Sequence, residues 1–435
     1  SYINGLPVTG QNLNQLKENN NQTQNLSSKL VYTEPLSKKY SLELGYEFTY
    51  ISGNNNQVTY SYSPVSGKYD AQVDSLTNDF DQLITIHKPS VKLNYSNKKI
   101  KVNIGSGFGL THFDMLDNTI NQDYIRNFTN FFPSASANYT YKPNHNFRFN
   151  YNGSTKQPSI NQLQPLTNNT DYYNQYIGNP DLKPSFTNNF NISHNSYNFI
   201  KDRWMYQSIN FNQSSNAITN NRIINTDSAK TITQPINTNG NYSFNIWAGG
   251  GFKIKKIDTR FNLNPNINYS RFADVINNKT SYSKNMSAGL GINISKSKDK
   301  KYDISLNNDF NYNTNKTSQA NATIKYYTNT LTADVTIYIH KVWSINTDYQ
   351  FYARQKTEQF SNNLNNQTWN ARLQKTFRNN EFTAFIKVRD ILNQNIGIER
   401  NFYSNTLSEE RNDRLKRYWL VGFTWDFKNK APKNK

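Results

Sequence analysis

Five histidines and no cysteines limit the chemistry open to this 435-residue chain. The histidines are spread irregularly, without the spacing of a zinc site, at His87, His112, His145, His194 and His340. The sequence also lacks a Gly-x-Ser-x-Gly elbow, a P-loop and a Cys–His pair. We therefore expect no catalytic residues, no metal ligands, no cofactor and no enzyme activity. A catalytic site assembled from distant parts of the chain is the alternative that spacing leaves open.

One segment has the chemistry to bind a sugar or a peptide. Between Gln157 and Asp181 it places aromatic rings beside amides and a carboxylate, at Asn168, Asn169, Asp171, Tyr172, Tyr173 and Tyr176. Aromatic faces stack on flat apolar surfaces, and amides and carboxylates exchange hydrogen bonds with polar solutes. These six residues are the candidate ligand-binding residues. The alternative is an ordinary solvated loop in a chain rich in Asn and Tyr.

The segments around these residues alternate apolar and polar side chains with a period of two, which is typical of strands with one apolar face. From Ile257 the apolar set reads Ile257, Thr259, Phe261, Leu263, Pro265, Ile267 and Tyr269. Between its members lie four amides that a dry core would not accept, Asn262, Asn264, Asn266 and Asn268. The same alternation begins at Tyr40, Ile100, Tyr242, Met286, Leu331, Trp343 and Phe382.

One of these segments changes its parity. Within Ala320–Ile339, Ile324 and Tyr326 occupy even positions, whereas the apolar residues from Leu331 onward occupy odd ones. An extra residue in a strand shifts its alternation by one. The pattern therefore predicts a β-bulge near Tyr327–Thr330.

The composition combines few apolar residues with many aromatic ones. Hydrophobic residues make up 35% of the chain and aromatic residues 14%. A disordered chain would be poor in aromatics, and no run approaches the roughly 20 apolar residues of a spanning helix. In a membrane barrel, half of each strand faces lipid and half faces a wet lumen, which gives this composition. We predict an all-β fold, a transmembrane antiparallel β-barrel.

The connections between the predicted strands are of two kinds. Short basic or polar turns lie near Ser37–Lys39, Ser96–Lys99, Lys142–His145, Lys201–Arg203, Lys255–Lys256, Lys296–Lys301, His340–Val342 and Arg378–Glu381. Longer polar loops are predicted at Gly53–Asp79, Asp114–Asp123, Gln157–Asp181 and Asn393–Asp413. Short turns at one end and long loops at the other are typical of bacterial outer-membrane barrels, whose short turns lie in the periplasm.

These turns imply about 17 strands, the first near Asn25–Glu34 and the last at Arg414–Phe427. An outer-membrane barrel has an even strand number, so an odd number is missing, and five more would give a 22-stranded barrel. The predicted organisation has three parts. Residues 1–24 end an extracellular loop or form an N-terminal remnant, residues 25–428 form the barrel strands and loops, and residues 429–435 form a basic periplasmic tail.

The net charge of +19 invites a nucleic-acid interpretation. However, the basic pairs Lys38-Lys39, Lys98-Lys99 and Lys255-Lys256 fall in the predicted short turns. Cations in tight turns are expected at a membrane surface, whereas a nucleic-acid-binding protein would carry them as a stripe along one face. We therefore expect the partner of the wall to be outer-membrane lipid, and no nucleic acid.

The last predicted strand carries an aromatic row on one face, at Trp419, Val421, Phe423, Trp425 and Phe427. Its Gly422-x-x-Trp425-x-Phe427 pattern resembles the assembly signal on the last strand of outer-membrane barrels. Gly422, Trp425 and Phe427 are therefore the candidate assembly residues. The alternative is a plain amphipathic strand. The tail from Lys428 to Lys435 departs from relatives that end on the aromatic residue.

A second motif carries a wider resemblance. Read from chemistry alone, Gly178-Asn179-Pro180-Asp181-Leu182-Lys183-Pro184 is a turn followed by a strand. With Gln162-Leu163 upstream, it resembles TonB-dependent receptors, in which such a stretch precedes a barrel strand. Together with the Asp390-Ile391-Leu392-Asn393-Gln394 stretch and the closing strand, the chain is most similar to the outer-membrane β-barrel family of Bacteroidetes, relatives of the SusC-type receptors.

This resemblance implies a receptor that takes up a nutrient of the oligosaccharide, peptide or siderophore class. It also implies an upstream plug and the TonB system as partners, and a SusD-like or other surface lipoprotein. The alternative is a non-transporting scaffold barrel of a larger outer-membrane assembly with lipoproteins. An adhesin or receptor surface without transport is a third interpretation.

Overall fold

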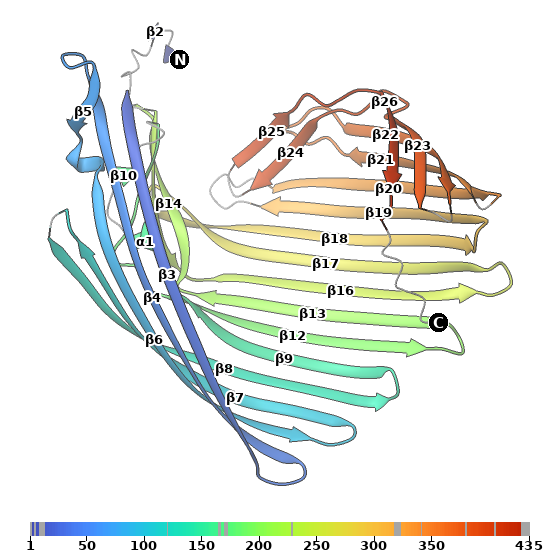
Figure 1. The fold of residues 1–435 in the computed structure, drawn as a ribbon, viewed down its shortest axis with the longest axis horizontal. Helices are drawn as coiled ribbons and strands as arrows, with labels where there is room; N and C mark the ends of the chain where they lie inside the picture. The colour runs from blue at the N-terminus through green and yellow to red at the C-terminus, as the bar shows by residue number, and fades with distance from the viewer. Residues whose placement is uncertain are drawn as a thin grey trace.

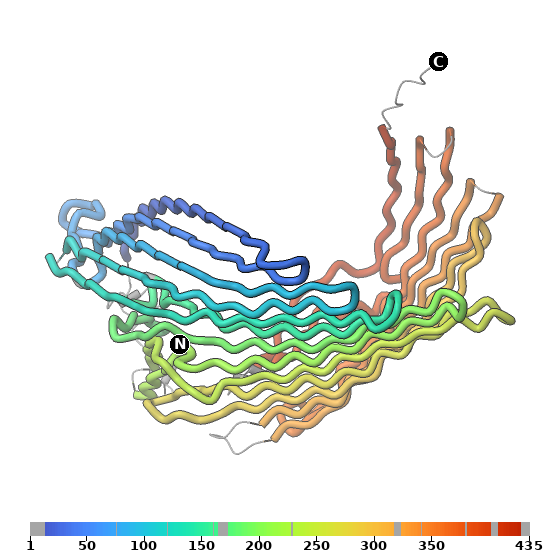
Figure 2. The backbone as a smooth tube through the Cα atoms, turned by 90° about the horizontal axis from the view of Figure 1, so that it is seen from below, coloured from blue at the N-terminus to red at the C-terminus, as the bar shows by residue number. Residues whose placement is uncertain are grey.

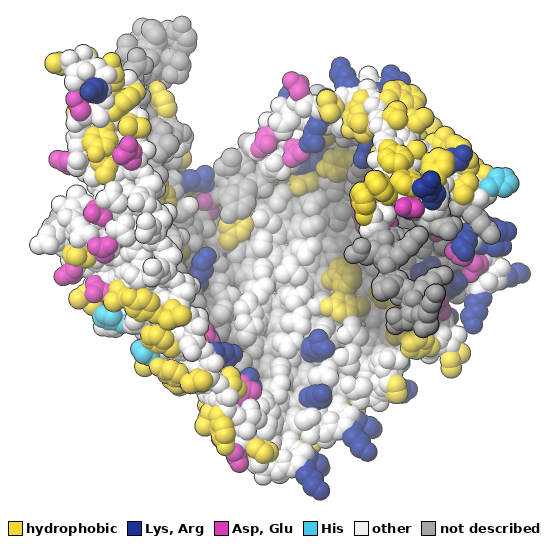
Figure 3. All heavy atoms as spheres, viewed as in Figure 1, with side chains coloured by type: hydrophobic (Ala, Val, Ile, Leu, Met, Phe, Trp, Pro, Cys, Tyr) yellow, Lys and Arg dark blue, Asp and Glu magenta, His cyan; other side chains and the backbone are white. Residues whose placement is uncertain are grey.

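The computed structural model describes residues 2–3, 6–7, 14–119, 121–163, 167–168, 173–227, 229–316, 323–340, 342–378, 381–403 and 406–427. Most of these residues belong to one antiparallel sheet that curves around a hollow (Figures 1 and 3). Among the described residues, no helix is both long and apolar enough to cross a membrane. The predicted tail, 429–435, lies outside the described residues.

Within the described ranges, seventeen strands follow one another in this wall. They are β3 (Gln15–Pro35), β4 (Tyr40–Ser63), β6 (Asn78–Ser96), β7 (Ile100–Asp117), β8 (Gln122–Lys142), β9 (His145–Lys156), β12 (Ser185–Asn198), β13 (Arg203–Ser215), β16 (Asn241–Ile254), β17 (Thr259–Ile276), β18 (Lys279–Lys298), β19 (Tyr302–Lys316), β20 (Thr323–Ile339), β21 (Trp343–Arg354), β22 (Leu364–Phe377), β23 (Phe382–Arg389) and β26 (Tyr418–Trp425). Each pairs antiparallel with the next in this order. The predicted fold class is therefore confirmed.

The remaining elements belong to the long connections or the N-terminal segment. They are β1 (Tyr2–Ile3), β2 (Leu6–Pro7), β5 (Lys68–Gln72), the 3-10 helix η1 (Asp74–Leu76), α1 (Ile160–Leu163), β10 (Thr167–Asn168), β11 (Asn174–Ile177), β14 (Ala217–Asn225), β15 (Lys230–Thr238), β24 (Ile398–Tyr403) and β25 (Thr406–Arg411). The eight short turns fall where they were predicted. They gather at one end of the wall, the short-turn end, and the long connections gather at the other, the long-loop end (Figure 1).

The first wall strand begins earlier than predicted. β3 pairs with β4 continuously from Gln15 to Pro35, ten residues before the expected start at Asn25. At about 3.3 Å per residue, a strand of 21 residues is far longer than the ~25 Å apolar band of a membrane barrel. The Asn- and Gln-rich part of β3 has no apolar alternation, yet it stays paired with β4 along its backbone. The β3–β4 ribbon therefore continues beyond the amphipathic part of the wall.

The strands β3 and β26 stand at the two ends of the series of pairings and lie apart in both views (Figures 1 and 2). Their apolar side chains are more exposed than those of inner strands. Leu30 on β3 is 70% exposed and Val421 on β26 is 81% exposed, whereas Leu263 on β17 is 50% exposed. Both end strands run from the long-loop end to the short-turn end.

The wall has the two faces that the alternation predicts. Leu263 and Ile267 of β17 are exposed on the convex side, and Asn262 of the same strand forms hydrogen bonds on the other side. Figure 3 shows a concave face dominated by side chains that are neither hydrophobic nor charged, with isolated lysines and arginines. The concave face is therefore polar, as the lumen-facing side of such a wall is expected to be.

The predicted bulge in β20 is wrong. β20 keeps one register with β19 from Thr323 to Ile337, without a shift near Tyr327–Thr330. The change of parity arises because two apolar residues face the hollow instead of the convex side. Ile324 is only 6% exposed, and the Arg354 guanidinium lies over the ring of Tyr326.

Candidate functional site

A row of hydrogen-bonded side chains crosses five strands on the concave face. The Trp204 indole N–H donates to Asn262 Oδ1 at 3.1 Å, and the Asn262 amide donates to Asn293 Oδ1 at 2.6 Å. The Asn293 amide then donates to Asn307 Oδ1 at 2.5 Å. These four residues lie on β13, β17, β18 and β19 and are in cross-strand register. The amides satisfy one another and still present polar atoms to the hollow.

The fifth strand of this row, β16, contributes a glycine. Gly251 is the cross-strand partner of both Trp204 and Asn262. A Cβ at Gly251 would lie 2.1 Å from Asn262 Oδ1 and 2.3 Å from Trp204 Nε1, closer than atoms can approach. The missing side chain is therefore what allows the indole to reach the amide across the intervening strand.

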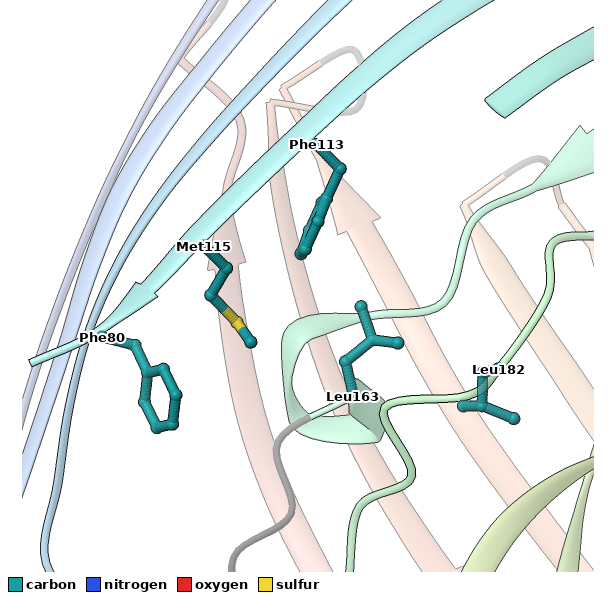
Figure 4. Close-up of a cluster of buried hydrophobic side chains, with 5 residues drawn as sticks. All are labelled: Phe80, Phe113, Met115, Leu163 and Leu182. Carbon is teal, nitrogen blue, oxygen red and sulfur yellow. The ribbon is translucent and has the colours of Figure 1, made fainter. Parts of the chain in front are cut away.

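A compact apolar cluster interrupts the polar concave face at the long-loop end. Phe80 of β6 and Phe113 and Met115 of β7 pack with Leu163 of α1 and with Leu182, and all five are at most 5% exposed (Figure 4). The first three side chains come from the wall, and the two leucines come from the loop between β9 and β12. Burial of these side chains fixes that loop against the concave face.

The alternation did not lead us to predict this cluster, although β7 contains a signal for it. Its apolar residues stand at even positions as far as Leu110, and beyond it the odd positions Phe113 and Met115 are apolar as well. The strand does not change its register with β8, so the odd residues face the hollow. Apolar residues on the wet side of a strand indicate that something covers them.

The Gly178–Pro184 motif forms the part of the loop that carries Leu182. The Asp181 N–H donates to Asn179 Oδ1 at 2.9 Å, and the Asn179 amide donates to the Pro235 carbonyl oxygen at 3.0 Å. The Lys183 N–H donates to Asn237 Oδ1 at 2.7 Å, and the Asn237 amide donates back to the Lys183 carbonyl oxygen at 2.9 Å. The motif is therefore a turn attached to β15, with Leu182 as its anchor in the apolar cluster.

The structure describes three of the six candidate ligand-binding residues and brings them together. Asn168 of β10 is the cross-strand partner of Tyr176 on β11, and the carbonyl oxygen of Tyr173 accepts a hydrogen bond from Thr231 N–H at 2.7 Å. β11 also pairs in parallel with β15, so these residues belong to one small sheet at the long-loop end. Burial raises the pKa of the Tyr176 hydroxyl. Asn169, Asp171 and Tyr172 lie outside the described residues.

The hairpin β24–β25 stands at the long-loop end beside β21 and β22. Arg400 donates from Nε to Glu409 Oε2 at 2.8 Å, and Arg411 Nη2 lies 2.7 Å from Glu409 Oε1. These two donors hold the pKa of the Glu409 carboxyl below its usual range. Arg400 Nη1 also donates to the Asn362 carbonyl oxygen at 2.6 Å, which ties the hairpin to the loop between β21 and β22.

The candidate assembly residues lie on the last wall strand and beyond it. Gly422 is the cross-strand partner of Phe385, whose ring lies over it. On the opposite face, the rings of Trp425 and Phe427 have centroids 4.0 Å apart, and Phe382 lies 5.5 Å from Trp425. The outward row is therefore a continuous aromatic surface at the short-turn end. Its role as an assembly signal stays a prediction.

His87, His145 and His194 are hydrogen-bond partners within the wall. His87 Nδ1 lies 2.7 Å from the Tyr46 hydroxyl, His194 Nε2 lies 2.9 Å from the Tyr141 hydroxyl, and His145 Nδ1 lies 2.6 Å from Ser196 Oγ. Within the ranges that the structure describes, no three His, Cys, Asp or Glu side chains are grouped so that they could hold a metal ion.

Comparisons with known proteins agree with this architecture. A family model described as "Outer membrane protein beta-barrel family" matches residues 2–285 and 275–425. No curated protein matches the chain.

Several solved structures are similar over most of the chain, at low identity. BauA, the ferric preacinetobactin receptor from Acinetobacter baumannii, is 9% identical with a TM-score of 0.44, and the match covers 94% of this chain and 64% of that one. FpvA of P. aeruginosa, in a complex with pyoverdine and Fe, is 11% identical with a TM-score of 0.31, covering 94% and 64%. OmpT, an outer membrane protein of Vibrio cholerae, is 7% identical with a TM-score of 0.32, covering 95% and 99%. The chain thus spans 64% of the length of the two receptors.

Proposed function

Because the chain belongs to the outer membrane protein beta-barrel family, and so to a bacterial outer membrane, we propose that it forms the wall of a TonB-dependent-receptor-like barrel that imports a nutrient. The observation that carries this proposal is the construction of the concave face. It combines a polar wall with a structured loop that is packed onto the wall from inside by Leu163 and Leu182. A passage for a bulky polar solute requires such a wet wall, and its selectivity requires structured loops at the entrance.

In this proposal the long-loop end faces the cell exterior, because short turns lie in the periplasm. The solute is captured at the entrance by the small sheet that contains Asn168, Tyr173 and Tyr176, through ring stacking and hydrogen bonds. It then moves along amides such as Asn262 and Asn293, which exchange hydrogen bonds with a hydrated solute. The ligand belongs to the oligosaccharide, peptide or siderophore class.

The complete receptor has further parts. β3 and β26 run in the same direction, so an antiparallel closure requires an odd number of strands between them. A strand edge in lipid must be paired, because its backbone groups find no water there. Five more strands would give the 22-stranded barrel of plugged transporters. The proposed receptor therefore includes these strands, an upstream plug that contacts TonB and, as in SusC-like proteins of Bacteroidetes, a SusD-like or other surface lipoprotein.

Uptake measurements in the organism that carries the gene test this function. The probes are fluorescent maltoheptaose, a fluorescent heptapeptide and ferric desferrioxamine, one for each ligand class. We expect deletion of the gene to abolish uptake of at least one probe, and a proton uncoupler to abolish the same uptake in the parent strain. Unchanged uptake of all three probes, together with loss of surface lipoproteins, would instead support the scaffold barrel.

A further inference from the structure

We propose that Arg354 anchors an anion-binding subsite at the entrance of the passage, which takes a carboxylate or phosphate group of the imported nutrient. This inference rests on the proposed import function and narrows its substrate class to acidic solutes. Arg354 is the last residue of β21 and lies at the long-loop end of the wall. Arg354 is only 6% exposed, although its side chain carries a permanent charge.

The surroundings of Arg354 hold its guanidinium in place without neutralising it. The group lies 4.2 Å from the centroid of the Tyr326 ring, and its Nη1 donates a hydrogen bond to the Arg400 carbonyl oxygen. The Arg354 side chain also hydrogen-bonds the Tyr352 hydroxyl. A ring face, a backbone carbonyl and the neutral Tyr352 hydroxyl supply partial charges only. The guanidinium N–H donors beyond these two hydrogen bonds are available to a ligand.

Two glutamates of the hairpin β24–β25 are engaged with other arginines, whereas Asp348, Asp390 and Asp413 line a second cavity beside this region. Glu409 pairs with Arg400, and Glu399 Oε1 lies 3.1 Å from Arg414 Nη2. Among the described residues, no carboxylate forms an ion pair with Arg354. A charge that is removed from water without a counter-ion is costly, so an anion supplied from outside would be bound with a gain in free energy.

A cavity of about 350 Å³ gives such an anion access to Arg354. Its lining includes three arginines and one glutamate, Arg354, Arg400, Arg414 and Glu399, together with the amides Asn366 and Asn395. A neighbouring cavity of about 520 Å³ shares Asn395 and Arg414 with it. The pair of cavities has room for a solute larger than a single ion.

The chemistry of these groups selects the ligand class. A guanidinium binds a carboxylate or a phosphate through two parallel N–H···O bonds, and this geometry makes arginine suited to both anions. The amides beside it can bind hydroxyl or amide groups of the same solute. The subsite therefore suits acidic oligosaccharides, acidic peptides or carboxylate-bearing chelators.

Calorimetric titration of the full-length receptor in detergent tests the subsite. The probes are trigalacturonate, inorganic phosphate and, as a neutral control, maltotriose. We expect trigalacturonate to bind with saturation, Arg354→Met to weaken it at least 10-fold, and Arg354→Lys to weaken it less, because lysine keeps the charge and loses the paired donors. Arg148→Met, which changes an exposed arginine on β9, should bind like the wild type.

Chemical modification of the wild type makes the test independent of the variants' folding. Trigalacturonate should slow the reaction of Arg354 with phenylglyoxal, as measured by mass spectrometry, and maltotriose should not. Equal affinity of the wild type and Arg354→Met, or no protection, would overturn the subsite. Binding of inorganic phosphate alone would overturn its assignment to the nutrient. Intact anion binding in a receptor whose deletion affects no uptake would overturn the import function and leave the subsite standing.

Discussion

The ring of Phe385 covers Gly422, its cross-strand partner in the last strand pair of the wall. A Cβ at Gly422 would lie 2.2 Å from Cζ of that ring. The glycine of the Gly422-x-x-Trp425-x-Phe427 pattern is therefore required by local packing on the concave face, whereas its aromatic residues face lipid.

This packing predicts that Gly422→Val prevents correct pairing of β26 with β23. The valine side chain would displace the Phe385 ring, and we expect at least a several-fold loss of folded barrel, measured by heat-modifiable migration of membrane fractions. Gly250→Ala is the matched control, because the nearest atom to a Cβ there is the Trp204 carbonyl oxygen at 3.7 Å. Equal yields of both variants would contradict the packing argument.

The outward row predicts a second effect. Replacing Trp425 and Phe427 together by Ser should impair membrane insertion, because the two rings form the end of the lipid-facing aromatic surface. The amount of protein in purified outer membranes measures the loss. Val65→Ser, at a 98% exposed position outside the wall strands, should leave insertion unchanged. Undiminished insertion of the double variant would argue for a plain amphipathic strand.

The apolar cluster predicts that Leu182→Ala frees the loop between β9 and β12 from the wall. Truncation of a fully buried leucine costs about 2–5 kcal/mol, and here this cost destabilises the loop and not the sheet. Hydrogen exchange should therefore rise in residues 173–184 and stay unchanged in β7. Leu263→Ala, at a half-exposed position on the convex face, should leave the exchange of the loop unchanged.

The ion pairs of Glu409 predict that the hairpin β24–β25 loosens in acid. The two arginines lower the pKa of the Glu409 carboxyl in the folded protein. The ion pairs therefore stabilise the hairpin fully above the ordinary carboxylate pKa, and this stabilisation is lost as the pH falls through the lowered pKa. Limited proteolysis of the hairpin as a function of pH measures this loss. Glu409→Gln should be cleaved readily at all pH values, whereas Glu410→Gln should keep the wild-type pH profile.

The alternation of side chains predicted the wall well, because a two-faced strand has a period that the sequence displays directly. It predicted the short turns and the number of wall strands, and it placed Asn262 and Leu263 on opposite faces. It was wrong at β20, where Ile324 and Tyr326 are apolar residues on the concave face. Alternation shows which residues are apolar, but it does not show whether an apolar residue faces lipid or is covered by another segment on the concave face.

The candidate site was predicted less completely, for a related reason. Tyr173 and Tyr176 were identified by residue type within one loop, and the structure places them in a small sheet with β15. Arg354 was not identified, because its significance depends on the hairpin β24–β25, which is distant in sequence. Contacts between separate loops are set by tertiary packing, which local spacing does not encode.

The row from Trp204 to Asn307 has a mechanical consequence. Sliding one strand past its neighbour would break the backbone ladder and, in the same movement, a side-chain hydrogen bond at each step of the row. The five strands from β13 to β19 are thus held against sliding past one another. A passage along this part of the wall can therefore widen or narrow only through movement of segments that pack on the concave face, such as the loop between β9 and β12.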